Sequence, residues 1–176
     1  MAKRIKRNLR SKRITHECLF SNPFEKKPWM YTKPQGENHS KTWFSECQRY
    51  FLDYCHANRI HLIHRMDLRQ LEPFNRLPDS SFDALMDSLL EQKYLVDWGN
   101  NSLRVYWRSN YSWSEDVYTV AKENKRDILY GLETLRDLDP GMLEIPKQDI
   151  NQIYQILVDN GKARWIDKDK MILKIL

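Results

Sequence analysis

Two stretches of this sequence decide the fold that we expect: residues 77–105, LPDSSFDALMDSLLEQKYLVDWGNNSLRV, and residues 145–173, IPKQDINQIYQILVDNGKARWIDKDKMIL. They align without a gap at a spacing of 68 residues, which is the distance from Leu77 to Ile145. The matched positions are apolar in both stretches: Phe82 with Ile150, Leu85 with Ile153, Leu89 with Leu157, Trp98 with Ile166, Leu103 with Met171, and Val105 with Leu173. An internal repeat of this kind indicates two copies of one structural unit.

Each copy predicts a helix followed by a β-hairpin. Leu77-Pro78 and Ile145-Pro146 open the two helices, and apolar residues at helical spacing form their buried faces. Asp79 or Ser80 would cap the first of these helices. Two runs in which residues alternate as in a β-strand then flank a turn, at residues 99–101 in the first copy and 167–170 in the second.

The segments before each copy complete the same unit. In the first unit, residues 40–55 predict a helix that Ser40 would cap, residues 60–63 a strand and residues 68–74 a brief second helix. In the second unit, residues 113–123, 128–130 and 132–138 predict the same three elements. The stripe expected to be buried on the first helix comprises Trp43, Phe44, Cys47, Phe51, Tyr54 and Cys55.

The order helix, strand, helix, helix, strand, strand in about 70 residues is that of a winged helix. We therefore expect an α+β fold, mainly α, with two tandem winged-helix domains and a disordered or extended basic N-terminal arm. The expected boundaries are 1–38 for the arm and leader, 39–109 for the first domain and 110–176 for the second.

Proline and aromatic residues dominate residues 22–34, NPFEKKPWMYTKP, which we call the leader. Its prolines, Pro23, Pro28 and Pro34, disfavour a helix and favour an extended, polyproline-like path. Residues 35–38, QGEN, are typical of a linker.

The net charge of +5 belongs to the N-terminal arm. The first 13 residues hold seven basic side chains and no acidic one, so 22 basic residues face 24 acidic ones in the remainder. Three interpretations of the arm remain open: a solvated, disordered segment, a contact with anionic lipid, and a contact with RNA. Its basic residues are Lys3, Arg4, Lys6, Arg7, Arg10, Lys12 and Arg13.

The folded body is poorly suited to reading DNA. A winged helix that reads DNA places its third helix in the major groove, and that helix should be basic. The first candidate carries four acidic residues, Asp79, Asp83, Asp87 and Glu91, against Lys93, and the second is close to neutral.

No set of residues in the sequence assembles an active site. Five scattered glycines form no nucleotide-binding motif, and the three cysteines form no CxxC pair. Cys47 and Cys55 lie on the buried stripe, and His56, His61 and His64 lack the paired spacing of metal ligands. We therefore expect no enzyme, no cofactor and no metal.

No apolar run approaches the roughly 20 residues that cross a bilayer. The basic N-terminus also lacks the apolar core of a secretory signal. With an odd number of cysteines, these features predict a soluble, intracellular chain.

The order of these features resembles the vacuolar protein sorting-associated protein 25 family, the small subunit of the ESCRT-II complex. The resemblance spans residues 22–176. It is carried by the leader, by the Leu77-Pro78 opening, by residues 93–98, KYLVDW, by Trp107-Arg108, and by Trp113 at the start of the second unit. Unlike typical members, this chain has about 20 residues of basic extension before the leader and lacks consecutive prolines in it.

This resemblance implies a non-catalytic adaptor. Members join larger winged-helix subunits to an ESCRT-III subunit during membrane sorting and budding, in the cytoplasm and on endosomal membranes where the host has endosomes. Carried over by position, the core subunits would contact Phe24, Pro28, Trp29, Tyr31 and Pro34. The ESCRT-III subunit would contact Lys162, Arg164, Trp165 and Lys168.

Two other functions compete with the adaptor. A DNA- or RNA-binding winged-helix protein would use the basic arm, and its binding would depend steeply on salt. A winged-helix scaffold in another assembly would carry helical repeats, which this chain lacks. For Trp29 and Trp165, packing inside their own domains is the alternative to partner binding.

Overall fold

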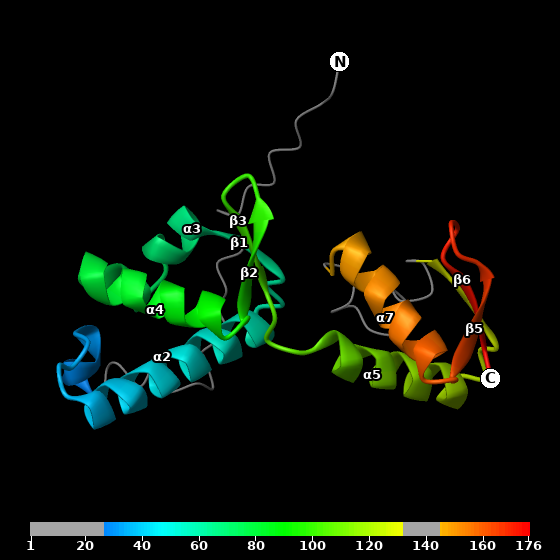
Figure 1. The fold of residues 1–176 in the computed structure, drawn as a ribbon, viewed down its shortest axis with the longest axis horizontal. Helices are drawn as coiled ribbons and strands as arrows, with labels where there is room; N and C mark the ends of the chain where they lie inside the picture. Colours follow the sequence, from blue (N-terminus) through cyan, green and yellow to red (C-terminus); the bar gives the residue numbers. More distant parts are fainter. Residues whose placement is uncertain (1–26, 132–144) are drawn as a thin grey trace, which may run out of the picture.

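The computed structural model describes residues 27–131 and 145–176, apart from the side chains of Pro28 and Trp29. The chain forms two lobes joined by a short extended segment before α5 (Figure 1). The first unit follows the 3-10 turn η2 (Pro28–Tyr31) and contains α2 (Glu37–Ala57), β1 (Leu62–His64), α3 (Arg65–Gln70), the 3-10 turn η3 (Phe74–Arg76), α4 (Asp79–Glu91), β2 (Leu95–Gly99) and β3 (Ser102–Val105). The second contains α5 (Asn110–Glu123), β4 (Ile128–Tyr130), α7 (Lys147–Asp159), β5 (Ala163–Asp167) and β6 (Ile172–Ile175). The short helix predicted at residues 132–138 lies outside the described residues.

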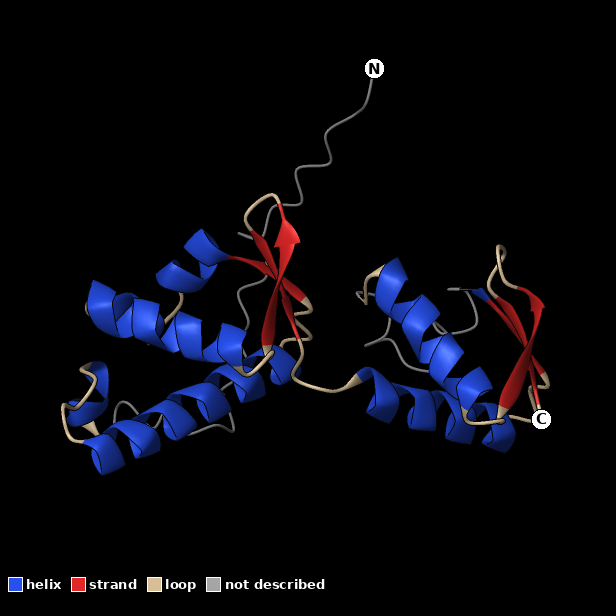
Figure 2. Ribbon diagram, viewed as in Figure 1, coloured by secondary structure: helices blue, strands red, loops and turns tan. Residues whose placement is uncertain are grey.

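Each unit has helices on one side of a small antiparallel sheet (Figure 2). The strand orders are β1-β3-β2 and β4-β6-β5, so the last strand of each unit is central. This confirms the tandem winged-helix fold and its α+β class.

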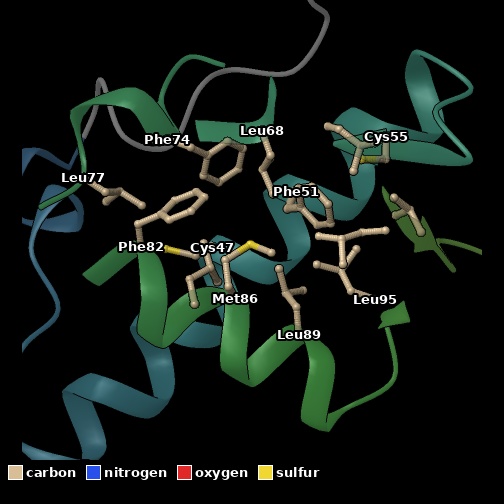
Figure 3. Close-up of a cluster of buried hydrophobic side chains, with 14 of the residues drawn as sticks. Cys47, Phe51, Cys55, Leu68, Phe74, Leu77, Phe82, Met86, Leu89 and Leu95 are labelled. Atoms are coloured by element: carbon tan, nitrogen blue, oxygen red, sulfur yellow. The ribbon is translucent and has the colours of Figure 1, made fainter. Parts of the chain in front are cut away.

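The first core lies between α2, α4 and the sheet (Figure 3). Trp43, Cys47, Phe51 and Cys55 are fully buried, which confirms most of the predicted stripe on α2. Phe44 and Tyr54 are only partly buried at its edges. From α4 the core receives Phe82, Leu85, Met86 and Leu89.

The second core is built by α5, α7 and their sheet. Ile150, Ile153 and Leu157 of α7 are fully buried, as the repeat predicts. Tyr154 is buried beside them, and its hydroxyl donates to the carbonyl of Gly131 at 3.0 Å. Burial raises the pKa of this hydroxyl, so it remains a hydrogen-bond donor.

The two wings differ in length, and the gapless alignment is therefore wrong beyond the turn. Gly99 pairs with Ser102 in the first wing, whereas Asp167 pairs with Ile172 in the second. The second turn is two residues longer, so Arg104 of the first unit corresponds to Lys174 of the second. Gly99, Asn100 and Asn101 all have positive φ, which explains the tight first turn.

The start of α2 also differs from the prediction. The helix begins at Glu37, and Gly36 precedes it without a side-chain cap. Ser40 lies inside the first turn, where its hydroxyl donates to the carbonyl of Pro34 at 3.2 Å. The serine thus fastens the leader to the helix instead of capping it. Similarly, α4 starts after Pro78 with no side-chain cap.

The leader packs on the first unit. Pro28–Tyr31 forms a 3-10 turn rather than the predicted extended path, because proline tolerates the first position of a helical turn. Met30 is fully buried in the first core, and the indole N–H of Trp43 donates to its carbonyl at 2.6 Å. The backbone N–H of Lys33 donates to the Ser81 hydroxyl at 3.1 Å. The leader is therefore part of this domain.

We predict that Met30→Ala lowers the free energy of unfolding of the first unit by about 2–5 kcal/mol, because it leaves a cavity in the core. Met66 is 68% exposed on α3, so Met66→Ala is the matched control, with an expected change below about 0.5 kcal/mol. Equilibrium urea unfolding measures both. Equal effects of the two substitutions would show that Met30 does not belong to the core.

Candidate interaction surfaces

The leader residues predicted to bind core subunits are only partly described. Phe24 lies outside the described residues, and Pro28 and Trp29 belong to η2. Tyr31 and Pro34 are half-buried on the first unit, and the Arg76 guanidinium lies 6.0 Å from the Tyr31 ring centroid. The seven basic residues of the arm also fall outside the described residues. At least two predicted contact residues therefore lie on the outer surface of the first unit.

The four residues predicted to bind an ESCRT-III subunit do not share one exposed face. Trp165 points toward the core, with its ring centroid 6.1 Å from that of Tyr154. Its indole N–H donates to Gln155 Oε1 at 3.3 Å. Arg164 is exposed on the opposite face of β5, and Lys168 lies in the wing turn. The ammonium of Lys168 is 5.9 Å from the Trp165 ring centroid.

Lys162 is already engaged within the second unit. Its ammonium donates to Glu115 Oε2 and lies 4.9 Å from the centroid of the Tyr118 ring. The hydrogen bond to Glu115 raises the pKa of Lys162. A partner would therefore have to compete with Glu115 for this cation.

The outer face of the second sheet presents residues that the sequence analysis did not single out. Lys174 stands at its centre, in register with Ile128 on one side and Arg164 on the other. Tyr130 and Ile166 are 55% and 53% exposed. Lys174 and Arg164 share this face because they are paired directly across neighbouring strands. Strand alternation within residues 172–175 was the sequence signal that could have found Lys174.

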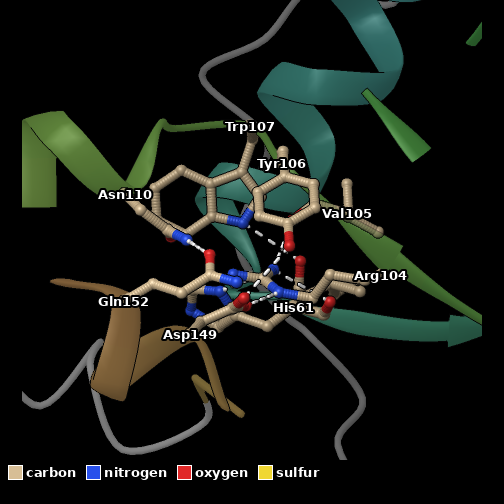
Figure 4. A network of polar contacts seen from close by, with 9 residues as sticks. His61, Arg104, Val105, Tyr106, Trp107, Asn110, Asp149 and Gln152 are labelled. Atoms are coloured by element: carbon tan, nitrogen blue, oxygen red, sulfur yellow. Dashed lines mark hydrogen bonds and ion pairs between the residues drawn. The ribbon is translucent and has the colours of Figure 1, made fainter. Parts of the chain in front are cut away.

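The corresponding face of the first sheet is covered by the second unit at its centre, where Arg104 lies, whereas Leu62 and Val96 beside it are 44% and 37% exposed. Arg104, the counterpart of Lys174, lies between Leu62 and Val96 in the register. Its guanidinium forms an ion pair with Asp149 in the first turn of α7, and both side chains are 1% exposed (Figure 4). The first sheet thus shows what this type of face can bind: a carboxylate at the start of a helix.

The third helix of neither unit is suited to a DNA groove. On α4, Asp79 and Asp83 form ion pairs with Arg69 and Arg65 at 2.7 and 2.8 Å, and the helix face remains acidic. On α7, Asp149 in the first turn is buried against the first unit. Recognition helices normally read bases with the residues at their start. The geometry therefore agrees with the charge argument against DNA reading.

The candidate metal and nucleophile residues have structural surroundings. Cys47 and Cys55 are fully buried, and burial raises the pKa of both thiols. His56 is exposed and stacks on Trp107 with 4.6 Å between ring centroids, whereas His61 is buried. Within residues 27–131 and 145–176, no three metal-ligating side chains are close enough to hold an ion.

The described part of the chain contains no helix that is long and apolar enough to cross a membrane. Its longest helix, α2, has 21 residues but carries charged side chains along its length. This helix instead packs its apolar stripe against α4.

We predict that Cys47 and Cys55 do not react with a thiol reagent at pH 8 in the folded protein, because the reactive thiolate is suppressed when burial raises the pKa. A Cys18→Ser chain isolates these two thiols. They should react on unfolding in guanidinium chloride. Rapid modification of either thiol in the native chain would contradict the packing role.

The comparisons with known proteins give matches at the level of structure. No family's sequence profile matches the chain, and no curated protein matches it in sequence. The crystal structure of subunit VPS25 of the endosomal trafficking complex ESCRT-II superposes with a TM-score of 0.65, covering 87% of this chain and 96% of that chain at 14% identity. Likeness at this identity establishes the fold. The chain has a VPS25-like fold, as the order of its sequence features predicted.

Proposed function

We propose that this chain is a non-catalytic adaptor subunit of an ESCRT-II-like complex, which links larger winged-helix subunits to an ESCRT-III subunit in membrane sorting and budding. The observation that carries the proposal is the shared architecture with VPS25 over 87% of the chain. Buried cysteines and engaged third helices support a binding role over catalysis or DNA reading. The protein would act in the cytoplasm and be recruited to membranes, endosomal ones where the host has them.

The leader is proposed to contact the larger subunits. Its 3-10 turn is anchored by Met30, so little conformational entropy is lost when its outward side binds a partner. Aromatic residues are frequent anchors of interfaces, and Trp29 and Tyr31 flank the buried Met30. Phe24, Pro28 and Pro34 complete the proposed contact.

The second unit is proposed to contact the ESCRT-III subunit through the outer face of its sheet and the adjoining wing. Arg164 and Lys168 extend the positive charge of Lys174, and Tyr130 supplies an exposed aromatic surface. In the first unit, the residue that corresponds to Lys174 is Arg104, and it binds the carboxylate of Asp149 at the start of a helix. A charged helix with an acidic residue in its first turn is thus the chemistry that this face fits. Lys162 and Trp165 support the face from within the unit.

The basic arm is proposed to add a contact with an anionic membrane or with RNA. Each Lys or Arg near an anionic surface contributes about 1 kcal/mol to binding. If the arm alone carried the function, the chain would instead be a nucleic-acid-binding protein. Deleting residues 1–13 would then abolish a strongly salt-dependent binding.

Co-purification with the two larger ESCRT-II subunits of the same organism, sized by light scattering, tests the adaptor role. We expect the full chain to form a stable complex and the double variant Trp29→Ala, Tyr31→Ala to weaken it at least about tenfold. Tyr111→Ala, an exposed aromatic residue on the second unit, is the control and should bind normally. A deletion through residue 36 is unsuitable because it removes the core residue Met30. No complex with the full chain would overturn the proposal.

We predict that Arg164→Glu weakens binding of the ESCRT-III subunit roughly tenfold, because it places a like charge opposite an acidic helix. Lys122→Glu makes the same charge change on an exposed residue of α5 and should alter affinity less than about twofold. Isothermal titration calorimetry at two salt concentrations measures both. Equal losses would indicate a non-specific charge effect and contradict the sheet-face site.

A further inference from the structure

We propose that the buried Arg104–Asp149 pair is the positioning device that fixes the angle between the two winged-helix units, so that the chain holds its two ends as one rigid body. Arg104 belongs to β3 of the first unit and Asp149 to α7 of the second. Their side chains are each 1% exposed. The burial of both charges thus depends on the docking of one unit against the other.

Hydrogen bonds from neighbouring residues fix the orientation of both charged side chains. Arg104 Nε donates to Asp149 Oδ2, and Nη1 donates to the carbonyls of His61, at 3.0 Å, and of Val105. The hydroxyl of Tyr106 donates to Asp149 Oδ1 at 3.0 Å, so both carboxylate oxygens have a donor. These partners leave the guanidinium and the carboxylate little freedom to reorient. Figure 4 shows the side chains converging on Asp149.

The winged-helix fold itself does not require this pair. The first-unit counterpart of Asp149 is Ser81, which accepts a hydrogen bond from the leader. The second-unit counterpart of Arg104 is Lys174, which is only partly buried. Each winged helix therefore forms with a different residue at one of the two positions, and the ion pair is a feature of the junction.

The remaining contacts at the junction are weaker constraints on the angle. Trp107 packs against both cores, with its ring centroid 5.3 Å from that of Trp113. Apolar packing is non-directional, so it favours closeness of the units more than one orientation. The hydrogen bond from Asn110 to Gln152, at 2.9 Å, joins α5 to α7 within the second unit, so it does not constrain the angle between the units.

Removal of one charge should open the junction instead of unfolding the units. A buried charge without its counter-charge is strongly destabilising, and separation of the units returns it to water. We expect the ratio of open to closed molecules to rise roughly 100-fold or more in Asp149→Asn and in Arg104→Gln. Gln152→Ala, which removes an exposed hydrogen bond within the second unit, one helical turn from Asp149, without leaving a buried charge, is the matched control and should stay closed.

Double electron–electron resonance measures the distance between two spin labels in the full chain. With one label on each unit, that distance reports the angle between the units. The labels go on Glu91→Cys and Glu123→Cys, both exposed helix positions, in a Cys18→Ser chain whose remaining cysteines are buried. The parent and Gln152→Ala should give one narrow distance distribution, and both charge variants a broad one. Amide NMR peaks of Leu89 and Leu157, one in each core, should persist.

Two outcomes would overturn the proposal. A narrow, unchanged distance distribution in both charge variants would show that other contacts set the angle. Loss of the Leu157 peak in both variants would show that the pair is needed for the fold of the second unit. The measurement uses the chain alone, so it fails or succeeds independently of the proposed adaptor function.

Discussion

A buried guanidinium and a buried carboxylate, supplied by different domains, constrain the whole structure. Arg104 stands in the centre of the first sheet and Asp149 in the first turn of α7. Neither charge can be removed from water without the other, because desolvation of a single ion costs far more than packing returns. The two winged helices are therefore held in one relative position because the two buried charges must stay paired. Apolar contacts around Trp107 keep the units close together.

The two copies of the repeated unit expose different surfaces, so the two ends of the molecule differ. In the first unit, Ser81 at the start of α4 bonds the leader, and Arg104 at the centre of the outer sheet face is buried by the second unit. In the second unit, Asp149 at the start of α7 is buried at the junction, whereas the outer sheet face around Lys174 is open. Each covered surface faces a neighbour in the chain. The leader at one end and the open sheet at the other are the surfaces that the proposed adaptor role would use.

The fold is one that many proteins use to read DNA, but here its surfaces have other roles. The helix that would enter the groove is acidic in one unit and docks through a buried Asp149 in the other. The outer face of the second sheet carries the exposed Tyr130 and Arg164 instead. The surface chemistry placed on a winged helix, and not its backbone, decides what it can bind.

The sequence by itself determined the local structure, because helices and strands have fixed periods that apolar residues must follow. The stripe on α2, the buried face of α4 and its repeat in α7 were all readable in this way, as was strand β4. Local reasoning misplaced features that depend on geometry at longer range. The second wing is two residues longer, which shifted the alignment of β6. For Trp165, the tertiary structure shows packing toward the core, which was the alternative to partner binding. Only the tertiary structure decided the role of Arg104 and Asp149. They are 45 residues apart and ordinary in their own elements, and their burial arises only when a sheet face of one domain meets a helix start of the other.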